Sequence, residues 1–319
     1  MQETETVLTY VEPASRLGLR AMGCLFEVLI WGLDRERSEG VAREALAEVR
    51  RLDRQLSHYR EDSDIARLNV LASHEWVRVE PDLFRLIRTC LEWSAETESA
   101  FDISCGALLE CWGFHRGTGR VPSAAEIERA LSLSGYTRVY LDEVTSRVHF
   151  AAPGLIINLG AVGKGYALDR AADVLRFYDV ECALLHGGQS TIVVLGSPPD
   201  ADAWRFPIRD PRDKSRVLAN VSIRDAALST SSYSEQYVEA DGMRYGHILD
   251  PRTGRPAGRS VLVSVTAPSG ARADALSTAF FVLGPEKAST FVQCHPEIGI
   301  VSLAEDEHGR AELTKVNLP

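Results

Sequence analysis

The stretch ADALSTAFF, residues 273–281, combines the two kinds of side chain that decide how this part of the chain folds. At the 3.6-residue period of a helix, Asp274 is a neighbour of both Ser277 and Thr278. The remaining residues of the stretch are mostly apolar and are suited to burial. We therefore predict a core helix that carries one carboxylate and two hydroxyls on the same face.

The flanking residues limit this helix and leave two interpretations of its polar face. Ser269 and Gly270 predict its start, and Gly284 and Pro285 predict its end, so Asp274 lies in the first or second turn. In the structural interpretation, the acid favours the helix dipole and the threonine donates a hydrogen bond to the i−4 carbonyl. In the functional interpretation, the carboxylate and hydroxyls hold a hard cation, which accepts oxygen ligands.

The composition is that of a globular protein that is long enough for a sizeable core. The chain has 319 residues, of which 45% are hydrophobic and 25% are charged. Its formal net charge of −10 argues against general binding to nucleic acids or anionic membranes, because phosphate backbones require a basic surface. An anionic ligand would therefore need a local positive site or a metal.

Cysteine usage and the N-terminal sequence indicate a cellular compartment. The six cysteines form no C-x-x-C pair and no zinc-type spacing with the eight histidines, so we expect reduced thiols. Residues 1–24 are acidic at their start and lack the apolar core of a signal peptide or membrane span. We expect a cytoplasmic protein without a membrane span, or an exported one if a leader has been trimmed.

Hydrophobic periodicity predicts a single α+β domain, with helices packed on mixed or antiparallel sheets. Helical spacing predicts helices over 36–56, 80–100 and 166–178, and Ser63 is expected to cap a short helix. Strands are predicted at 25–32, 139–144, 147–152, 155–160, 183–188, 191–196, 205–210 and 217–225. Short turns between several of these strands favour antiparallel pairing.

One glycine-bearing turn, INLGAVGKGYALDR at residues 157–170, could approach a phosphate. A strand is expected to end at Leu159 and a helix to begin near Tyr166, so free N–H groups and the helix dipole would form an anion cradle beside Lys164. The turn matches neither the P-loop nor the G-x-G-x-x-G pattern. An ordinary glycine-rich turn is therefore the alternative.

Two further glycine-bearing turns have the same potential. In LLHGGQST, residues 184–191, a Gly-Gly turn lets the backbone approach a ligand closely. In RYGHILDPRTGRPAG, residues 244–258, His247, Asp250 and Arg252 share a loop that contains two prolines. The alternative for the second loop is a salt-bridged turn.

Seven stretches of the chain, in order, resemble the ApbE family of FAD:protein FMN transferases. They are MGCLFEV (22–28), LSHYREDSDIARLN (56–69), AFDISCGALLECWGF (100–114), INLGAVGKGYALDRAADVL (157–175), LLHGGQSTIVVLG (184–196), LSTSSYSEQYVEADGMRYGHILDPRTGRPA (228–257) and SVTAPSGARADALSTAFFVLGPEKA (264–288). The resemblance implies an ApbE-like domain over residues 17–319, preceded by an N-terminal extension over residues 1–16.

The resemblance also implies an activity. It implies a Mg²⁺-dependent enzyme that binds FAD as a substrate and cleaves its pyrophosphate. The FMN half would become esterified to a Thr or Ser hydroxyl of an acceptor flavoprotein, and AMP would be released. Two alternatives stay open: an FAD pyrophosphatase that produces FMN and AMP, and a non-catalytic FAD-binding protein.

Residue by residue, the resemblance assigns three roles. The metal ligands would be Asp274, Ser277, Thr278 and the carbonyl of Ala161, and the catalytic residues would be His247, Asp274 and Lys164. The FAD-binding residues would be Met22, Tyr59, Ala100, Phe101, Asp102, Asn158, Lys164 and Ile248. The segment 103–107 and the string HGGQS depart from the commonest family pattern, which leaves the choice of acceptor and the fit of the flavin open.

Overall fold

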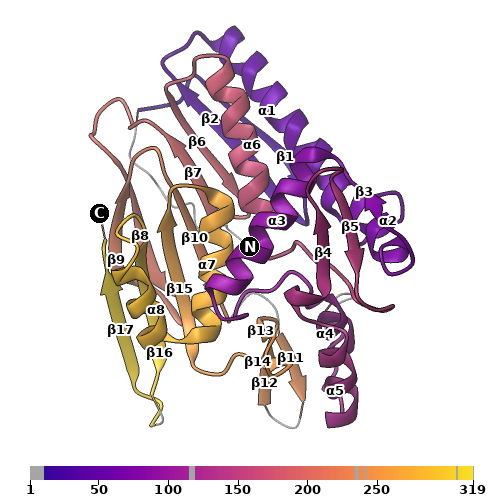
Figure 1. The fold of residues 1–319 in the computed structure, drawn as a ribbon. Coiled ribbons are helices and arrows are strands. Elements are labelled where there is room, and N and C mark those ends of the chain that lie inside the picture. The colour runs from indigo at the N-terminus through magenta and orange to yellow at the C-terminus, as the bar shows by residue number, and fades with distance from the viewer. Residues whose placement is uncertain (1–10, 115–118, 234–236, 241–242, 307, 319) are drawn as a thin grey trace.

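An eight-stranded antiparallel sheet forms the centre of the computed structural model, which describes residues 11–114, 119–233, 237–240, 243–306 and 308–318 (Figure 1). The strand order is β1-β2-β6-β7-β10-β15-β16-β17, and every neighbouring pair is antiparallel. The strands are β1 (Ser15–Ala21), β2 (Cys24–Trp31), β6 (Cys182–Gly187), β7 (Thr191–Leu195), β10 (Ala227–Ser232), β15 (Ser260–Ala267), β16 (Gly299–Glu305) and β17 (Ala311–Val316).

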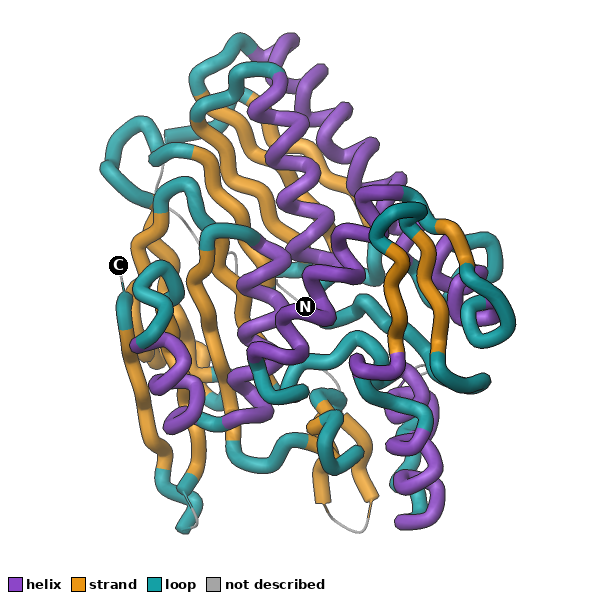
Figure 2. Tube along the Cα trace, in the orientation of Figure 1, coloured by secondary structure: helices purple, strands orange, loops and turns teal. Residues whose placement is uncertain are grey.

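Helices cover one face of this sheet. α1 (Arg35–Leu56), α6 (Gly163–Phe177) and α7 (Gly270–Leu283) lie beside one another across it, with α3 (Pro81–Glu96) and α8 (Pro285–Gln293) nearby (Figures 1 and 2). Alternation along the strands makes the two faces distinct, since Leu185 packs with the helices while Leu184 packs on the opposite face.

A two-stranded hairpin, β8 (Trp204–Asp210) and β9 (Asp213–Ile223), contributes most of the apolar residues packed against that opposite face. The ring of Trp204 lies 5.1 Å from that of Trp31 in β2, which fixes the hairpin to the sheet through aromatic contact. The central strands of the large sheet are therefore buried on both faces, whereas the edge strand β17 is mostly exposed.

Smaller elements surround this core. A three-stranded sheet has the order β3-β5-β4 and consists of β3 (Val77–Arg78), β4 (Val139–Asp142) and β5 (Arg147–Phe150). The other elements are α2 (Asp64–Leu71), α4 (Gly106–Cys111), α5 (Ala124–Ser132), the 3-10 helix η2 (Tyr136–Arg138), and the paired strands β11 (Tyr237–Ala240) with β12 (Met243–Gly246) and β13 (Leu249–Asp250) with β14 (Arg255–Pro256).

The structure confirms the α+β fold and most of the predicted elements. Ser63 caps α2 by accepting a hydrogen bond from Ala66 N at 2.9 Å, and Ser269 caps α7 by accepting one from Arg272 N at 3.3 Å. Gly284 ends α7 with a φ of +82°, a conformation that favours glycine. Among the described residues, no helix combines the length and the apolar character needed to span a bilayer.

The predicted strand at 155–160 is wrong. Leu155, Ile157 and Leu159 are buried, but the backbone around them forms only an isolated bridge between Ile156 and Cys105. The amide of Asn69 instead binds both the N–H and the C=O of Ile157, at 2.8 and 2.9 Å. The buried apolar residues therefore produced a strand-like pattern in a segment whose backbone forms hydrogen bonds with a side chain and not with a neighbouring strand.

Candidate active site

Asp274 is a buried carboxylate at the point where α6 and α7 meet the large sheet. It is 5% exposed and accepts three hydrogen bonds. The donors are Gly165 N at 2.7 Å, Thr191 Oγ1 at 2.8 Å and Ser229 Oγ at 2.6 Å. These donors belong to α6, β7 and β10, so segments that are far apart in the sequence converge on one carboxylate.

The first turns of α6 and α7 are joined reciprocally. Asp274 of α7 binds Gly165 N of α6, while Asp169 of α6 accepts hydrogen bonds from Gly270 N and Ala271 N of α7 at 2.6 and 2.9 Å. Because the first N–H groups of a helix have no acceptor within it, each carboxylate satisfies donors of the other helix. The two backbones also touch, since a Cβ on Gly165 would lie 2.1 Å from Gly270 O.

Two hydroxyls of α7 lie next to Asp274, as the helical spacing predicts. Ser277 Oγ lies 3.0 Å from Asp274 O and 2.9 Å from Ser231 Oγ. Thr278 Oγ1 donates to Asp274 O at 3.2 Å, which is the i−4 bond of the structural interpretation. A hydroxyl that donates its proton keeps its oxygen lone pairs, so this bond is compatible with contact to a cation.

Positive charge and a backbone turn complete this part of the site. α6 begins at Gly163, three residues before the predicted start, and Lys164 lies in its first turn with Nζ donating to Ser190 Oγ at 2.5 Å. Ala161 lies in the turn just before α6, close in sequence to the N–H of Gly165 that binds Asp274. The turn is therefore held beside the carboxylate.

Burial and the charge of Lys164 act in opposite directions on the ionisation of Asp274. Burial raises the pKa of the Asp274 carboxyl above its ordinary value, and the charge of Lys164 is the largest of the influences that oppose this rise. The site offers one carboxylate, hydroxyls and backbone carbonyls, and this all-oxygen set fits Mg²⁺, which usually keeps waters and substrate oxygens as its other ligands. Across the described ranges, no group of three or more His, Cys, Asp or Glu side chains is placed to hold a metal ion.

Three of the residues assigned to FAD are Met22, Asn158 and Tyr59. Met22 lies close to the start of α6, and the other two lie beside His58. Met22 adopts a φ of +48°, and its N–H donates to the Asp53 carboxylate at 2.7 Å. Its sulfur lies 4.0 Å from where a Cβ of Gly163 would be. The amide of Asn158 lies 3.3 Å from His58 Nε2, and the centre of the His58 ring lies 3.8 Å from that of Tyr59, which is 63% exposed.

The other assigned segment, residues 100–102, is buried. Ala100, Phe101 and Asp102 are 1%, 2% and 6% exposed. The Asp102 carboxylate accepts hydrogen bonds from Ser104 N, Ser104 Oγ and Tyr136 N, and burial raises its pKa above the ordinary value. This side chain organises the surrounding loops, and its assignment to FAD stays a prediction.

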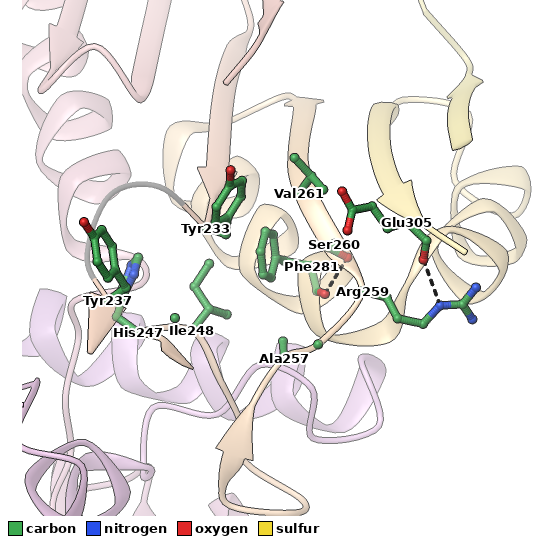
Figure 3. Close-up of a pocket in the computed structure, with 12 residues that line it drawn as sticks. Tyr233, Tyr237, His247, Ile248, Ala257, Arg259, Ser260, Val261, Phe281 and Glu305 are labelled. Atoms are coloured by element: carbon green, nitrogen blue, oxygen red, sulfur yellow. Dashed lines mark hydrogen bonds between the residues drawn. The ribbon is translucent and has the colours of Figure 1, made fainter. Parts of the chain in front are cut away.

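His247 and Ile248 line a cavity of about 240 Å³ (Figure 3). The half-buried His247 follows β12, and the carbonyl of Ile248 accepts a hydrogen bond from Ala257 N at 2.9 Å. In the same loop, Arg252 donates to both carboxylate oxygens of Asp250 at 2.8 Å, which confirms the predicted salt-bridged turn. The ion pair between Asp250 and Arg252 holds the loop in place, and His247 lies beside the cavity.

Several residues of the site were not predicted. Thr191, Ser229 and Ser231 are neighbours of Asp274 or Ser277 in space only, and Asp169 lies within a helix where an exposed acid would look the same. The run LSTSS at residues 228–232 was the available signal, because hydroxyls on both faces of a strand are unusual in a sheet buried on both sides.

Comparison with known proteins extends the match beyond single motifs. The ApbE family model matches residues 22–301. The chain belongs to the ApbE family. A protein named FAD:protein FMN transferase from Escherichia coli strain K12 is 30% identical over 92% of this chain and 85% of its own length. A protein of the same name from Treponema pallidum is 33% identical over 80% of this chain and 75% of its own.

Solved structures of ApbE proteins share the fold. The crystal structure of the ApbE protein from Thermotoga maritima superimposes with a TM-score of 0.84 at 32% identity, covering 94% of this chain and 96% of that one. Apo flavinyl transferase ApbE from Pseudomonas stutzeri superimposes with a TM-score of 0.81 at 32% identity, covering 95% and 94%. The α+β architecture is thus that of the ApbE family.

Proposed function

We propose that this protein is a Mg²⁺-dependent FAD:protein FMN transferase. The observation that carries the proposal is the buried Asp274 site, where a carboxylate, two hydroxyls and a lysine meet at two helix N-termini. Such a site suits a cation and a phosphate together, because the cation takes oxygen ligands and helix N-termini bind anions. The relatives named FAD:protein FMN transferase support the identity of the substrate.

In the proposed reaction, the hydroxyl oxygen of a Thr or Ser in the acceptor flavoprotein attacks the FMN-side phosphorus of FAD. A new P–O bond forms to the acceptor, and the bond from that phosphorus to the bridging oxygen breaks, so AMP leaves with that oxygen. The acceptor hydroxyl loses its proton, and we assign His247 as the group that takes it. Mg²⁺ held by Asp274, Ser277, Thr278 and the Ala161 carbonyl would neutralise charge on the pyrophosphate.

The residues of the chain would mainly bind and orient. Lys164 and the N–H groups at the start of α6 would hold phosphate oxygens, which suits phosphoryl transfer because positioning and charge stabilisation supply most of its catalysis. Met22, Tyr59 and Asn158 would contact the flavin half of FAD, and Ile248 would pack against the ligand beside His247. Burial of Asp274 would keep water away from the reacting phosphate.

Incubation with FAD, Mg²⁺ and a candidate acceptor flavoprotein tests the proposal. AMP release together with covalent flavin on the acceptor is the expected result. AMP release with free FMN and no covalent flavin would instead identify a pyrophosphatase. FAD binding without AMP release under any metal condition would identify a non-catalytic flavin-binding protein.

A further inference from the structure

A largely buried arginine connects α7, the helix of Asp274, to the end of α3. Arg272 lies in the first turn of α7, two residues before Asp274, and its side chain is 13% exposed. Its Nη2 donates to Glu96 Oε1 at 2.5 Å, and its guanidinium lies 5.2 Å from the centre of the Trp93 ring and 5.7 Å from that of Phe291. Residues of α3 and α8 therefore hold one guanidinium of α7 through an ion pair and two cation–π contacts.

The α3 side of this contact leads into residues 100–102, which are assigned to FAD. The ring of Trp93 lies 6.4 Å from that of Phe101 in an edge-to-face arrangement. In the turn between them, Thr97 Oγ1 accepts a hydrogen bond from Phe101 N at 3.3 Å. Arg272, Trp93 and Phe101 thus form a continuous series of contacts from α7 to the assigned segment.

The turn that carries this segment has a strained backbone. Glu98 and Ser99 have φ values of +52° and +62°, in a region that residues other than glycine rarely occupy. Such residues persist only where the surrounding structure holds them, and strain of this kind clusters at ligand sites. The ion pair of Glu96 with Arg272 lies immediately before the turn, where it can hold this conformation.

Stability alone does not require a charge at this position. Arg272 Nη1 is buried and has no hydrogen-bond partner in the described part of the chain. A buried ion pair often stabilises a fold no more than apolar side chains of similar volume do. His295 Nε2 also lies 3.3 Å from Glu96 Oε1, so basic side chains of both α7 and the end of α8 converge on the last residue of α3. The contact is therefore suited to fixing one arrangement of α3 against α7.

We propose that Arg272 is a positioning residue that holds residues 100–102 against α7 and so sets FAD relative to Asp274. The inference rests on the proposed transferase function and on its assignment of this segment to FAD. Without Arg272 the strained turn would populate other conformations. The apparent affinity for FAD would then fall in proportion to the fraction of molecules that keep the binding conformation.

Arg272→Met separates positioning from stability, because methionine fills the apolar space between the rings but removes the charge. Arg272→Lys keeps the charge without the planar guanidinium, and Arg272→Met/Glu96→Gln also removes the carboxylate that the single variant leaves without Arg272. Arg212→Met is the control, because Arg212 in the β8–β9 turn also bridges two acids, Asp210 and Glu305, at 2.9 and 3.1 Å. The Kd for FAD is measured by flavin fluorescence without Mg²⁺, and the melting temperature is measured by calorimetry.

Arg272→Met and the double variant should each raise the Kd for FAD about tenfold without a fall in melting temperature, as when about a tenth of the molecules keep the binding conformation. Arg272→Lys should recover part of the affinity, and Arg212→Met should keep the wild-type Kd even if it melts earlier. An unchanged Kd in the double variant, or a Kd that rises only in variants that melt earlier, would overturn the proposal. FAD binding by the wild-type protein without AMP release in Mg²⁺ would count against the transferase function, while the comparison of Kd values would still test the positioning.

Discussion

Replacement of Gly165 by alanine tests the contact between the first turns of α6 and α7. The added Cβ would lie 2.1 Å from Gly270 O and 2.6 Å from Ala271 N, and both are backbone atoms that cannot rotate away. The helices must therefore separate, which would also stretch the 2.7 Å bond from Gly165 N to Asp274. The substitution should lower both stability and activity.

The magnitude follows from three contributions. Overpacking costs about 1–3 kcal/mol, and loss of a hydrogen bond to a charged group costs about 1.5–3 kcal/mol. Alanine regains about 1 kcal/mol of helix propensity. We expect a net loss of about 1.5–5 kcal/mol in the free energy of unfolding, because the gain in propensity offsets only part of the cost.

Calorimetric melting of Gly165→Ala beside Gly40→Ala measures this effect. Gly40 lies in α1, and a Cβ there would meet nothing within 4 Å, so the same substitution should stabilise the protein by about 0.5–1 kcal/mol. AMP release at low temperature, where both variants are folded, should fall only in Gly165→Ala. Equal melting temperatures for the two variants would refute the reasoning about the helix contact.

Three further predictions concern single side chains. Asp274→Ala should abolish AMP release while FAD binding, measured by flavin fluorescence, largely survives, and full activity would remove the metal assignment. His247→Asn should slow transfer roughly 100-fold to 10,000-fold with a nearly unchanged melting temperature. A lower melting temperature with normal turnover would instead show that His247 has a structural role. Burial raises the pKa of Asp169 to about 7, so between about pH 4 and 7 the folded protein holds a proton that the unfolded chain has lost. The contribution of Asp169 to the free energy of unfolding should therefore fall as pH rises through this window. Denaturant titrations should show a smaller difference in the free energy of unfolding between pH 5 and pH 8 for Asp169→Asn than for the parent protein.

Local signals in the sequence were sufficient to predict α7. Its start at Ser269, its end at Gly284 and the shared face of Asp274, Ser277 and Thr278 all depend on residues within one helix. The start of α6 was harder to predict from the sequence. Glycines 163 and 165 are poor helix formers, and the place of Gly165 in the helix depends on packing against Gly270, more than a hundred residues later.

The surroundings of Asp274 could not be predicted from periodicity. Thr191 and Ser229 are 83 and 45 residues away from it, and only the order of strands in the large sheet brings them together. Sheet order is a long-range property that hydrophobic patterns do not encode. The resemblance to ApbE proteins supplied the assignment of Asp274, Ser277 and Thr278 to a metal, which stays a prediction, but it did not supply the hydroxyls that hydrogen-bond to Asp274.

The reciprocal pairing of Asp169 with α7 and of Asp274 with α6 bears on how the protein is made. During synthesis α6 leaves the ribosome about a hundred residues before its partner, and the N–H of Gly165 has no carboxylate to bind until α7 follows. β10 must also have joined β7 before Thr191 and Ser229 can face the same oxygen. The hydrogen-bonded cluster around Asp274 should therefore form late and in one step. A chain stalled before α7 would contain most of the strands of the sheet but not this cluster.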